Sequence, residues 1–81
     1  MKTRIEDRIK QLVADHFGIE KDEVTNQMSF NDDLSATAVE ITDLFTMVEH
    51  DLEVKITSEE IKTLKTVGEL IQFIEDNSDE F

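Results

Sequence analysis

The sequence predicts an all-α fold, a four-helix bundle with three longer helices, one short helix and a long structured loop between the first two. Apolar residues recur at helical spacing in separate segments. The motif Thr-x-x-Glu, which can form a capping box at a helix start, precedes each of these segments. Strand-like alternation is confined to residues 52–56, which have no partner strand, so we expect an extended connector there.

The first helix is expected to follow the box formed by Thr3 and Glu6. Its apolar residues share one helical face and are Ile5, Ile9, Leu12, Val13 and Phe17. Gly18 comes directly after them, where a glycine commonly ends a helix. The connection from Gly18 to about Ala36 is too apolar for a solvated linker, so we expect it to pack across the bundle. Its apolar residues are Ile19, Val24, Met28, Phe30 and Leu34.

Three further boxes are expected to start the remaining helices; they are Thr37 with Glu40, Thr57 with Glu60, and Thr66 with Glu69. The apolar stripe of the second helix comprises Ile41, Leu44, Phe45, Val48 and Leu52. The third helix is short and carries Ile61 and Leu64, and the fourth carries Val67, Leu70, Ile71 and Ile74. We expect one domain over residues 1–81, with a frayed tail at about 77–81.

The composition excludes several functions. There are 20 acidic and 8 basic residues, a formal net charge of −12, which disfavours nucleic acid and favours basic partners. The chain has no cysteine and no apolar stretch long enough to enter or cross a membrane, so we expect a cytoplasmic protein, and we expect a monomer. His16 and His50 have no neighbours at metal-ligand spacing, so no metal site is expected.

Two rival classes fit poorly. A calcium-binding helix–loop–helix needs glycine at the sixth position of its loop and acids at the first and third. The two glycines, Gly18 and Gly68, would place Val13 and Thr63 at the first position, so the spacing fails. An enzyme is equally disfavoured, because the chain lacks a cysteine, a serine beside a histidine and a phosphate-binding glycine loop, and no catalytic residue is expected.

The segment Phe30-Asn-Asp-Asp-Leu-Ser-Ala-Thr-Ala-Val-Glu-Ile-Thr-Asp-Leu44 resembles the acyl carrier proteins of fatty acid synthesis. The pattern of that family is Phe-x-x-Asp-Leu-Gly-Ala-Asp-Ser-Leu-Asp-x-x-Glu-Leu, and the two align without a gap. The similarity continues upstream at Phe17-Gly-Ile19 and downstream at Thr66-Val67, so it covers nearly the whole chain. The resemblance implies a protein that presents acyl chains on a 4′-phosphopantetheine arm to enzymes of fatty acid or related acyl-transfer biosynthesis.

The chain departs from this pattern at the attachment site. In the family a serine at the start of the second helix is esterified by phosphopantetheine, and here that position is Ala38, flanked by Thr37 and Val39. Alanine has no hydroxyl, so the resemblance implies that this chain stays in the unmodified (apo) form. Ser35 lies three residues too early to replace the missing serine. Ala38 is either a deliberate replacement or a mark of a diverged regulatory or scaffold protein that binds enzymes without a prosthetic group.

The resemblance also implies a docking face on the second helix. In the family this helix meets Lys and Arg patches on synthase, reductase, dehydratase and transferase enzymes, including the phosphopantetheinyl transferase. The residues that we expect to bind partners are Glu40, Asp43, Met47, Glu49 and Ile56, with Asp51 nearby. Thr42 and Thr46 replace apolar residues of the family pattern, which we expect to alter partner choice.

Overall fold

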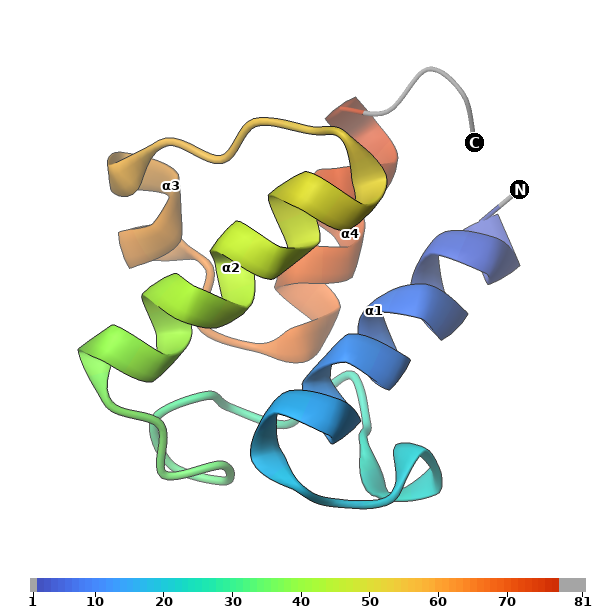
Figure 1. Ribbon diagram of the computed structural model, residues 1–81, viewed down its shortest axis with the longest axis vertical. Coiled ribbons are helices and arrows are strands. Elements are labelled where there is room, and N and C mark those ends of the chain that lie inside the picture. The colour runs from blue at the N-terminus through green and yellow to red at the C-terminus, as the bar shows by residue number, and fades with distance from the viewer. Residues whose placement is uncertain (1, 78–81) are drawn as a thin grey trace.

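Four α-helices and one turn of 3-10 helix make up the regular structure in the computed structural model, which describes residues 2–77 and the side chains of 5–77. The elements are α1 (Lys2–Phe17), η1 (Lys21–Glu23), α2 (Ala38–Leu52), α3 (Ser58–Thr63) and α4 (Val67–Asn77). Helix α1 packs against both α2 and α4, and the short α3 packs against α2 (Figure 1). The predicted all-α bundle with one short helix and a long first connection is confirmed.

The core lies where the apolar stripes of α1, α2 and α4 face one another. The largest fully buried side chains include Ile5, Ile9, Leu44, Phe45, Leu70 and Ile74. Every buried residue among those described is apolar. Full burial of each such side chain contributes about 1.5 to 3 kcal/mol, so the three stripes supply most of the driving force for folding.

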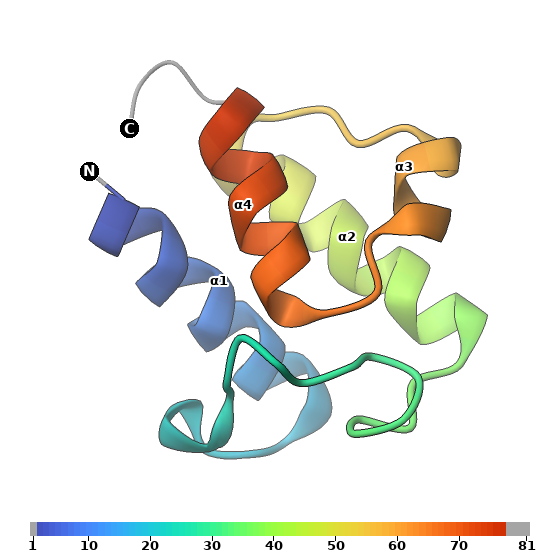
Figure 2. The ribbon, with the colours of Figure 1, turned by 180° about the vertical axis from the view of Figure 1, so that it is seen from behind.

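The long connection between α1 and α2 crosses the bundle rather than extending into solvent (Figure 2). It leaves α1 at Gly18, which has a left-handed φ of 69°, and Ile19 N donates a hydrogen bond back to Ala14 O at 3.0 Å. Phe30 is only 1% exposed and meets Phe45 edge-on, with ring centroids 5.5 Å apart. The loop therefore adds its own side chains to the core, as its apolar composition predicts.

The loop also pairs with the segment that leads into α4, which the sequence does not predict. Phe30 N donates to Lys65 O at 3.0 Å, and Gly68 N donates to Asn26 O at 2.8 Å. These hydrogen bonds flank a single antiparallel bridge and hold the loop against the start of α4. They fix Phe30 beside the space between α2 and α3.

Reciprocal capping boxes start the last three helices, as predicted. At α2, Glu40 N donates to Thr37 Oγ1 at 3.2 Å, and Thr37 N donates to Glu40 Oε1 at 2.9 Å. The same pair of bonds joins Thr57 to Glu60 at α3 and Thr66 to Glu69 at α4. Each box satisfies backbone N–H groups that the helix itself leaves free, so these starts are encoded locally.

The prediction for the first box is wrong. Helix α1 already includes Lys2, so Thr3 lies inside the helix and not at its cap. At the other end, Asn77 is the last helical residue, and the rest of the predicted frayed tail lies outside the described residues. Within residues 2–77, no helix combines the length and the apolar character that a membrane span requires.

Candidate functional site

The start of α2 presents the residues at the position of the expected attachment site. Thr37 is the N-cap, with extended backbone angles of −80° and 167°, and Ala38 is the first helical residue. Ala38 and Val39 are exposed, and Val39 keeps 70% of its surface in solvent. Ser35, three residues before Ala38, is exposed in the loop and has a left-handed φ of 52°. The structure thus places Thr37, Ala38 and Val39 together at an accessible helix end.

The side chain of Ala38 does not fit covalent attachment of phosphopantetheine at the helix start. A phosphoester needs an oxygen nucleophile, and Ala38 ends in a methyl group. The neighbouring Thr37 Oγ1 accepts the hydrogen bond from Glu40 N and serves the capping box. The site can therefore present a helix end to a partner, but Ala38 itself cannot carry the arm.

The outer face of α2 carries a stripe formed by Val39, Asp43 and Met47, which we call the outer stripe. These residues follow one another at four-residue intervals, so they lie along one side of the helix. Val39 and Met47, 70% and 37% exposed, are the large apolar side chains that the described part of the chain leaves in solvent. Asp43 between them is exposed. The face is therefore an acid flanked by two apolar groups.

The remaining acids of α2 also serve the fold. Glu40 is exposed, but its Oε1 accepts from Thr37 N in the capping box. Glu49 is half-buried, and its Oε2 accepts from Ile56 N at 2.7 Å. Asp51 accepts two hydrogen bonds from Arg8 on α1, the one from Nη2 at 2.6 Å. Of the acids expected on the docking face, Asp43 is the one without an intramolecular partner among the described residues.

The assignment of Ile56 to the docking face needs correction. Its side chain is 6% exposed and belongs to the core cluster, because the segment after α2 folds back over the bundle. In the sequence, an apolar residue at the end of an extended connector gives the same pattern whether its side chain faces a partner or the core. The sequence alone therefore does not distinguish a docking residue from a core residue at this position. Ile56 packs into the core and leaves little apolar surface for a partner.

The pair formed by Arg8 and Asp51 also shifts the pKa of both groups. The hydrogen bonds from Arg8 lower the pKa of the Asp51 carboxyl and raise the pKa of the Arg8 guanidinium. The pair links α1 to the last turn of α2. Asp51 is therefore a fold contact between helices, although its position next to Glu49 suggested a place on the docking face.

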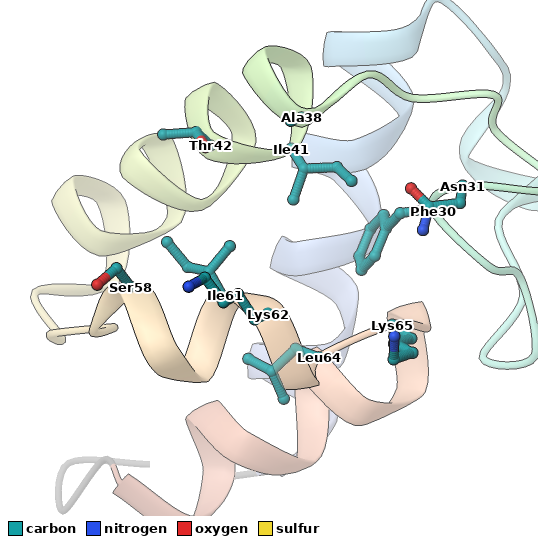
Figure 3. A pocket seen from close by; sticks show the side chains of 10 residues that line it. All are labelled: Phe30, Asn31, Ala38, Ile41, Thr42, Ser58, Ile61, Lys62, Leu64 and Lys65. Atoms are coloured by element: carbon teal, nitrogen blue, oxygen red, sulfur yellow. The ribbon is translucent and has the colours of Figure 1, made fainter.

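An open cavity of about 420 Å³ lies between α2 and α3, beside Phe30 of the loop (Figure 3). Ile41 of α2 and Ile61 of α3 extend toward this space from opposite sides. The cavity is lined by Phe30, Asn31, Ala38, Ile41, Thr42, Ser58, Ile61, Lys62, Leu64 and Lys65. Sequence analysis missed it, because Ile41, Ile61 and Leu64 were expected only to pack. The signal available in the sequence was that α3 is too short to bury its own apolar residues.

The histidines lie near helix ends, as expected. His16 is in the last turn of α1, with its ring edge-on to Phe17 at a centroid distance of 4.9 Å, and His50 is exposed in the last turn of α2. Among the described residues no group of three or more His, Cys, Asp or Glu side chains is arranged to hold a metal ion.

The structure is a small helical bundle with an exposed start of α2, and comparison with known proteins gives its family. The family model for the phosphopantetheine attachment site matches residues 7–74. Acyl carrier proteins from Clostridium perfringens strains SM101 and 13 are each 33% identical over 73 residues, covering 90% of this chain and 96% of theirs. The chain belongs to the acyl carrier protein family, whose members are carriers and not enzymes.

The fold comparison agrees. The structure of the acyl carrier protein from Enterococcus faecalis superposes with a TM-score of 0.82 at 27% identity, covering 96% of this chain and 99% of the other. The four-helix arrangement and the long loop after α1 are therefore those of a solved carrier protein. This likeness concerns the backbone, and the side chains at the start of α2 decide what the site can do.

Proposed function

We propose that this chain acts as an unmodified carrier protein that docks on enzymes of fatty acid synthesis or related acyl transfer through α2. The observation that carries the proposal lies at the start of α2, the carrier-type helix start. Thr37 and Glu40 cap this helix, and its first residue, Ala38, ends in a methyl group. Docking needs only the surface of α2, whereas holding an acyl arm at this position needs a hydroxyl.

The outer stripe gives this proposal its chemistry. Asp43, and the charge that Glu40 retains in the capping box, attract a basic patch and orient the approach of a partner. Val39 and Met47 then supply apolar contact on either side of Asp43. The net charge of −12 extends the attraction to basic surfaces beyond direct contact.

The same proposal covers location and assembly. We propose a cytoplasmic monomer, and the net charge of −12 supports a monomer because like-charged copies repel one another. Sedimentation equilibrium at about 0.15 M salt tests this, where charge repulsion between molecules is screened beyond roughly 8 Å. A stable dimer under these conditions would contradict it.

The proposal is tested by restoring the hydroxyl. The Ala38→Ser variant, incubated with coenzyme A and a broad-specificity phosphopantetheinyl transferase, is expected to gain the mass of one phosphopantetheine group, because the capped helix start and Asp43 are retained. Intact mass spectrometry measures the gain. The unchanged chain, treated identically, is expected to gain nothing.

Two results contradict the proposal in different ways. A mass gain on the unchanged chain would mean that another residue, such as Ser35, accepts the group. No gain on Ala38→Ser would mean that Thr37 and Val39 have removed recognition by the transferase, which would favour a diverged regulator or scaffold. Circular dichroism of the variant shows whether the helices are intact.

A further inference from the structure

A groove between α1 and α2 shares no lining residue with the cavity between α2 and α3. Its open volume is about 400 Å³, and it is lined by Leu12 of α1 and by Thr46, Met47, His50 and Asp51 of α2. The two helices lie side by side along it (Figure 1). The groove continues the outer stripe toward α1, because Met47 belongs to both.

The apolar surface of the groove comes from Leu12 and Met47. Leu12 is 8% exposed and belongs to the core cluster, so it forms a fixed floor, whereas Met47 is 37% exposed. The unbranched thioether of a methionine adapts to the shape of a side chain that packs against it. The groove therefore offers a partner a place for one aliphatic side chain.

The pair of Arg8 and Asp51 holds one end of the groove in place. Arg8 Nη2 donates to Asp51 Oδ1 at 2.6 Å, which joins α1 to the last turn of α2 beside the groove. Because this link exists before a partner arrives, the two walls need little ordering on binding. The bond also occupies the guanidinium of Arg8 within the fold.

The opposite end of the groove is acidic. The salt-bridged pair and, one turn further along α1, Leu12 with Met47 show that the two helices run antiparallel. The same progression by one more turn places Asp15 of α1 and Asp43 of α2 at the same end. Both are exposed, and neither forms an ion pair within residues 5–77. This end therefore attracts cations.

We infer that a helix of a partner enzyme seats one leucine-sized aliphatic side chain in this groove, with lysine or arginine one turn away meeting Asp15 and Asp43. An apolar anchor in a groove, with complementary charges at the edge, is a common way for a helix to dock. The inference rests on the proposed docking of α2 on enzymes. It adds that the partner's anchor lies between α2 and α1 and not between α2 and α3.

The test uses the unchanged chain and a synthetic helical peptide of about 16 residues, which carries one leucine with arginines one turn from it. NMR titration is expected to give saturable shifts at the methyl signals of Leu12 and Met47, with those of Ile61 and Leu64 unmoved. Replacing the leucine of the peptide by alanine is expected to weaken binding roughly 5- to 30-fold, the loss for a leucine that the groove buries partly to fully. No saturable binding, or equal binding of both peptides, would overturn the inference.

Two matched variants of the chain locate the contact. Thr46 and Thr42 are both exposed on α2, but Thr46 lines the groove and Thr42 lines the cavity between α2 and α3. Thr46→Arg places bulk and a positive charge in the groove, so it is expected to weaken binding of the peptide about 5-fold or more. Thr42→Arg, with the same change in net charge, is expected to weaken it less than about 2-fold. Circular dichroism shows whether the helices of both variants are intact.

The outcomes separate this inference from the proposed function. Equal losses in Thr46→Arg and Thr42→Arg would overturn the groove as the seat of the leucine, while docking on α2 would stand. Docking itself is measured with the unchanged chain and a phosphopantetheinyl transferase. The absence of association there would overturn both the proposed function and the inference that rests on it.

Discussion

At the scale of single residues, Asp51 links two helices through a charge that can be removed by pH. Arg8 donates to both Asp51 oxygens, and these bonds lower the pKa of Asp51. A carboxyl with a depressed pKa in the folded state contributes stability above its unfolded pKa, about 3.9, and loses that contribution as the pH falls through the folded value.

Asp51→Asn is therefore expected to lower the Tm at pH 7 by a few degrees at most, because the pair is solvent-exposed. The difference from the unchanged chain is expected to shrink toward zero as the pH falls through the lowered pKa of folded Asp51, since the carboxyl is then increasingly protonated in both states. Thermal melts from pH 2 to 7 measure it. A Tm difference that stays constant over this range would show that the loss comes from packing and not from charge.

Gly68 marks a close approach of two chain segments. An added Cβ would lie 2.9 Å from Asn26 O, a backbone atom that also accepts from Gly68 N. Gly68→Ala improves helix propensity by about 1 kcal/mol, but the clash must displace the loop from the start of α4. Overpacking costs about 1 to 3 kcal/mol, so we expect a net loss of stability in urea unfolding.

Gly18→Ala provides the contrast for this prediction. Gly18 has open space around its Cβ position, so its cost comes from the left-handed φ alone, about 1 to 2 kcal/mol. The loss at Gly68 is expected to be accompanied by chemical-shift changes at Asn26 and Phe30, which the Gly18 variant leaves unchanged. Increased stability of Gly68→Ala would show that the loop yields easily.

At the scale of elements, the capping boxes of α2 and α3 stabilise helices of very different burial. Helix α2 buries Leu44, Phe45, Val48 and Leu52, whereas the six-residue α3 contains no fully buried residue. Loss of an N-cap threonine costs about 0.5 to 2 kcal/mol. Where that cost falls depends on whether the helix unfolds with the core or by itself.

Thr37→Ala is expected to lower the global Tm, because α2 cannot unfold without the core. Thr57→Ala is expected to leave the Tm nearly unchanged while speeding hydrogen exchange at Ile61 and Leu64, since α3 can open locally. Calorimetry and amide exchange by NMR separate the two. Equal Tm losses in both variants would show that α3 unfolds together with the bundle.

The same contrast shows how far sequence reasoning reaches. Stripes and capping boxes depend on residues a few positions apart. Local patterns therefore predict helices α2 and α3 with their starts, and also the start of α4. The roles of Ile56 and Asp51 depend on which distant segments meet them, as do the loop bridge and the α2–α3 cavity. The exposure of Val39, Asp43 and Met47 follows from the apolar stripe of α2 alone. Which acids of α2 make contacts within the fold depends on the three-dimensional arrangement of the helices.

At the scale of the whole molecule, docking is expected to depend on where a negative charge lies and not only on how many there are. Asp43 is the suitable position for a test, because Glu40 holds a capping box, Glu49 holds Ile56 N and Asp51 pairs with Arg8. Changing those acids would disturb the fold together with the surface. Asp43 is exposed and sits between Val39 and Met47 on the outer stripe.

Asp43→Lys is therefore expected to slow association of the chain with a phosphopantetheinyl transferase roughly 2- to 10-fold at low salt, because one attraction becomes a repulsion. The effect is expected to fade as salt rises from about 0.01 M to 0.15 M, where the Debye length shrinks from roughly 30 Å to 8 Å. Surface plasmon resonance gives the rates. Asp22→Lys is the control, since Asp22 is exposed on η1, which packs against α1, and changes the net charge identically. Equal slowing by both variants would mean that bulk charge steers the encounter and that the outer stripe of α2 is not a specific docking surface.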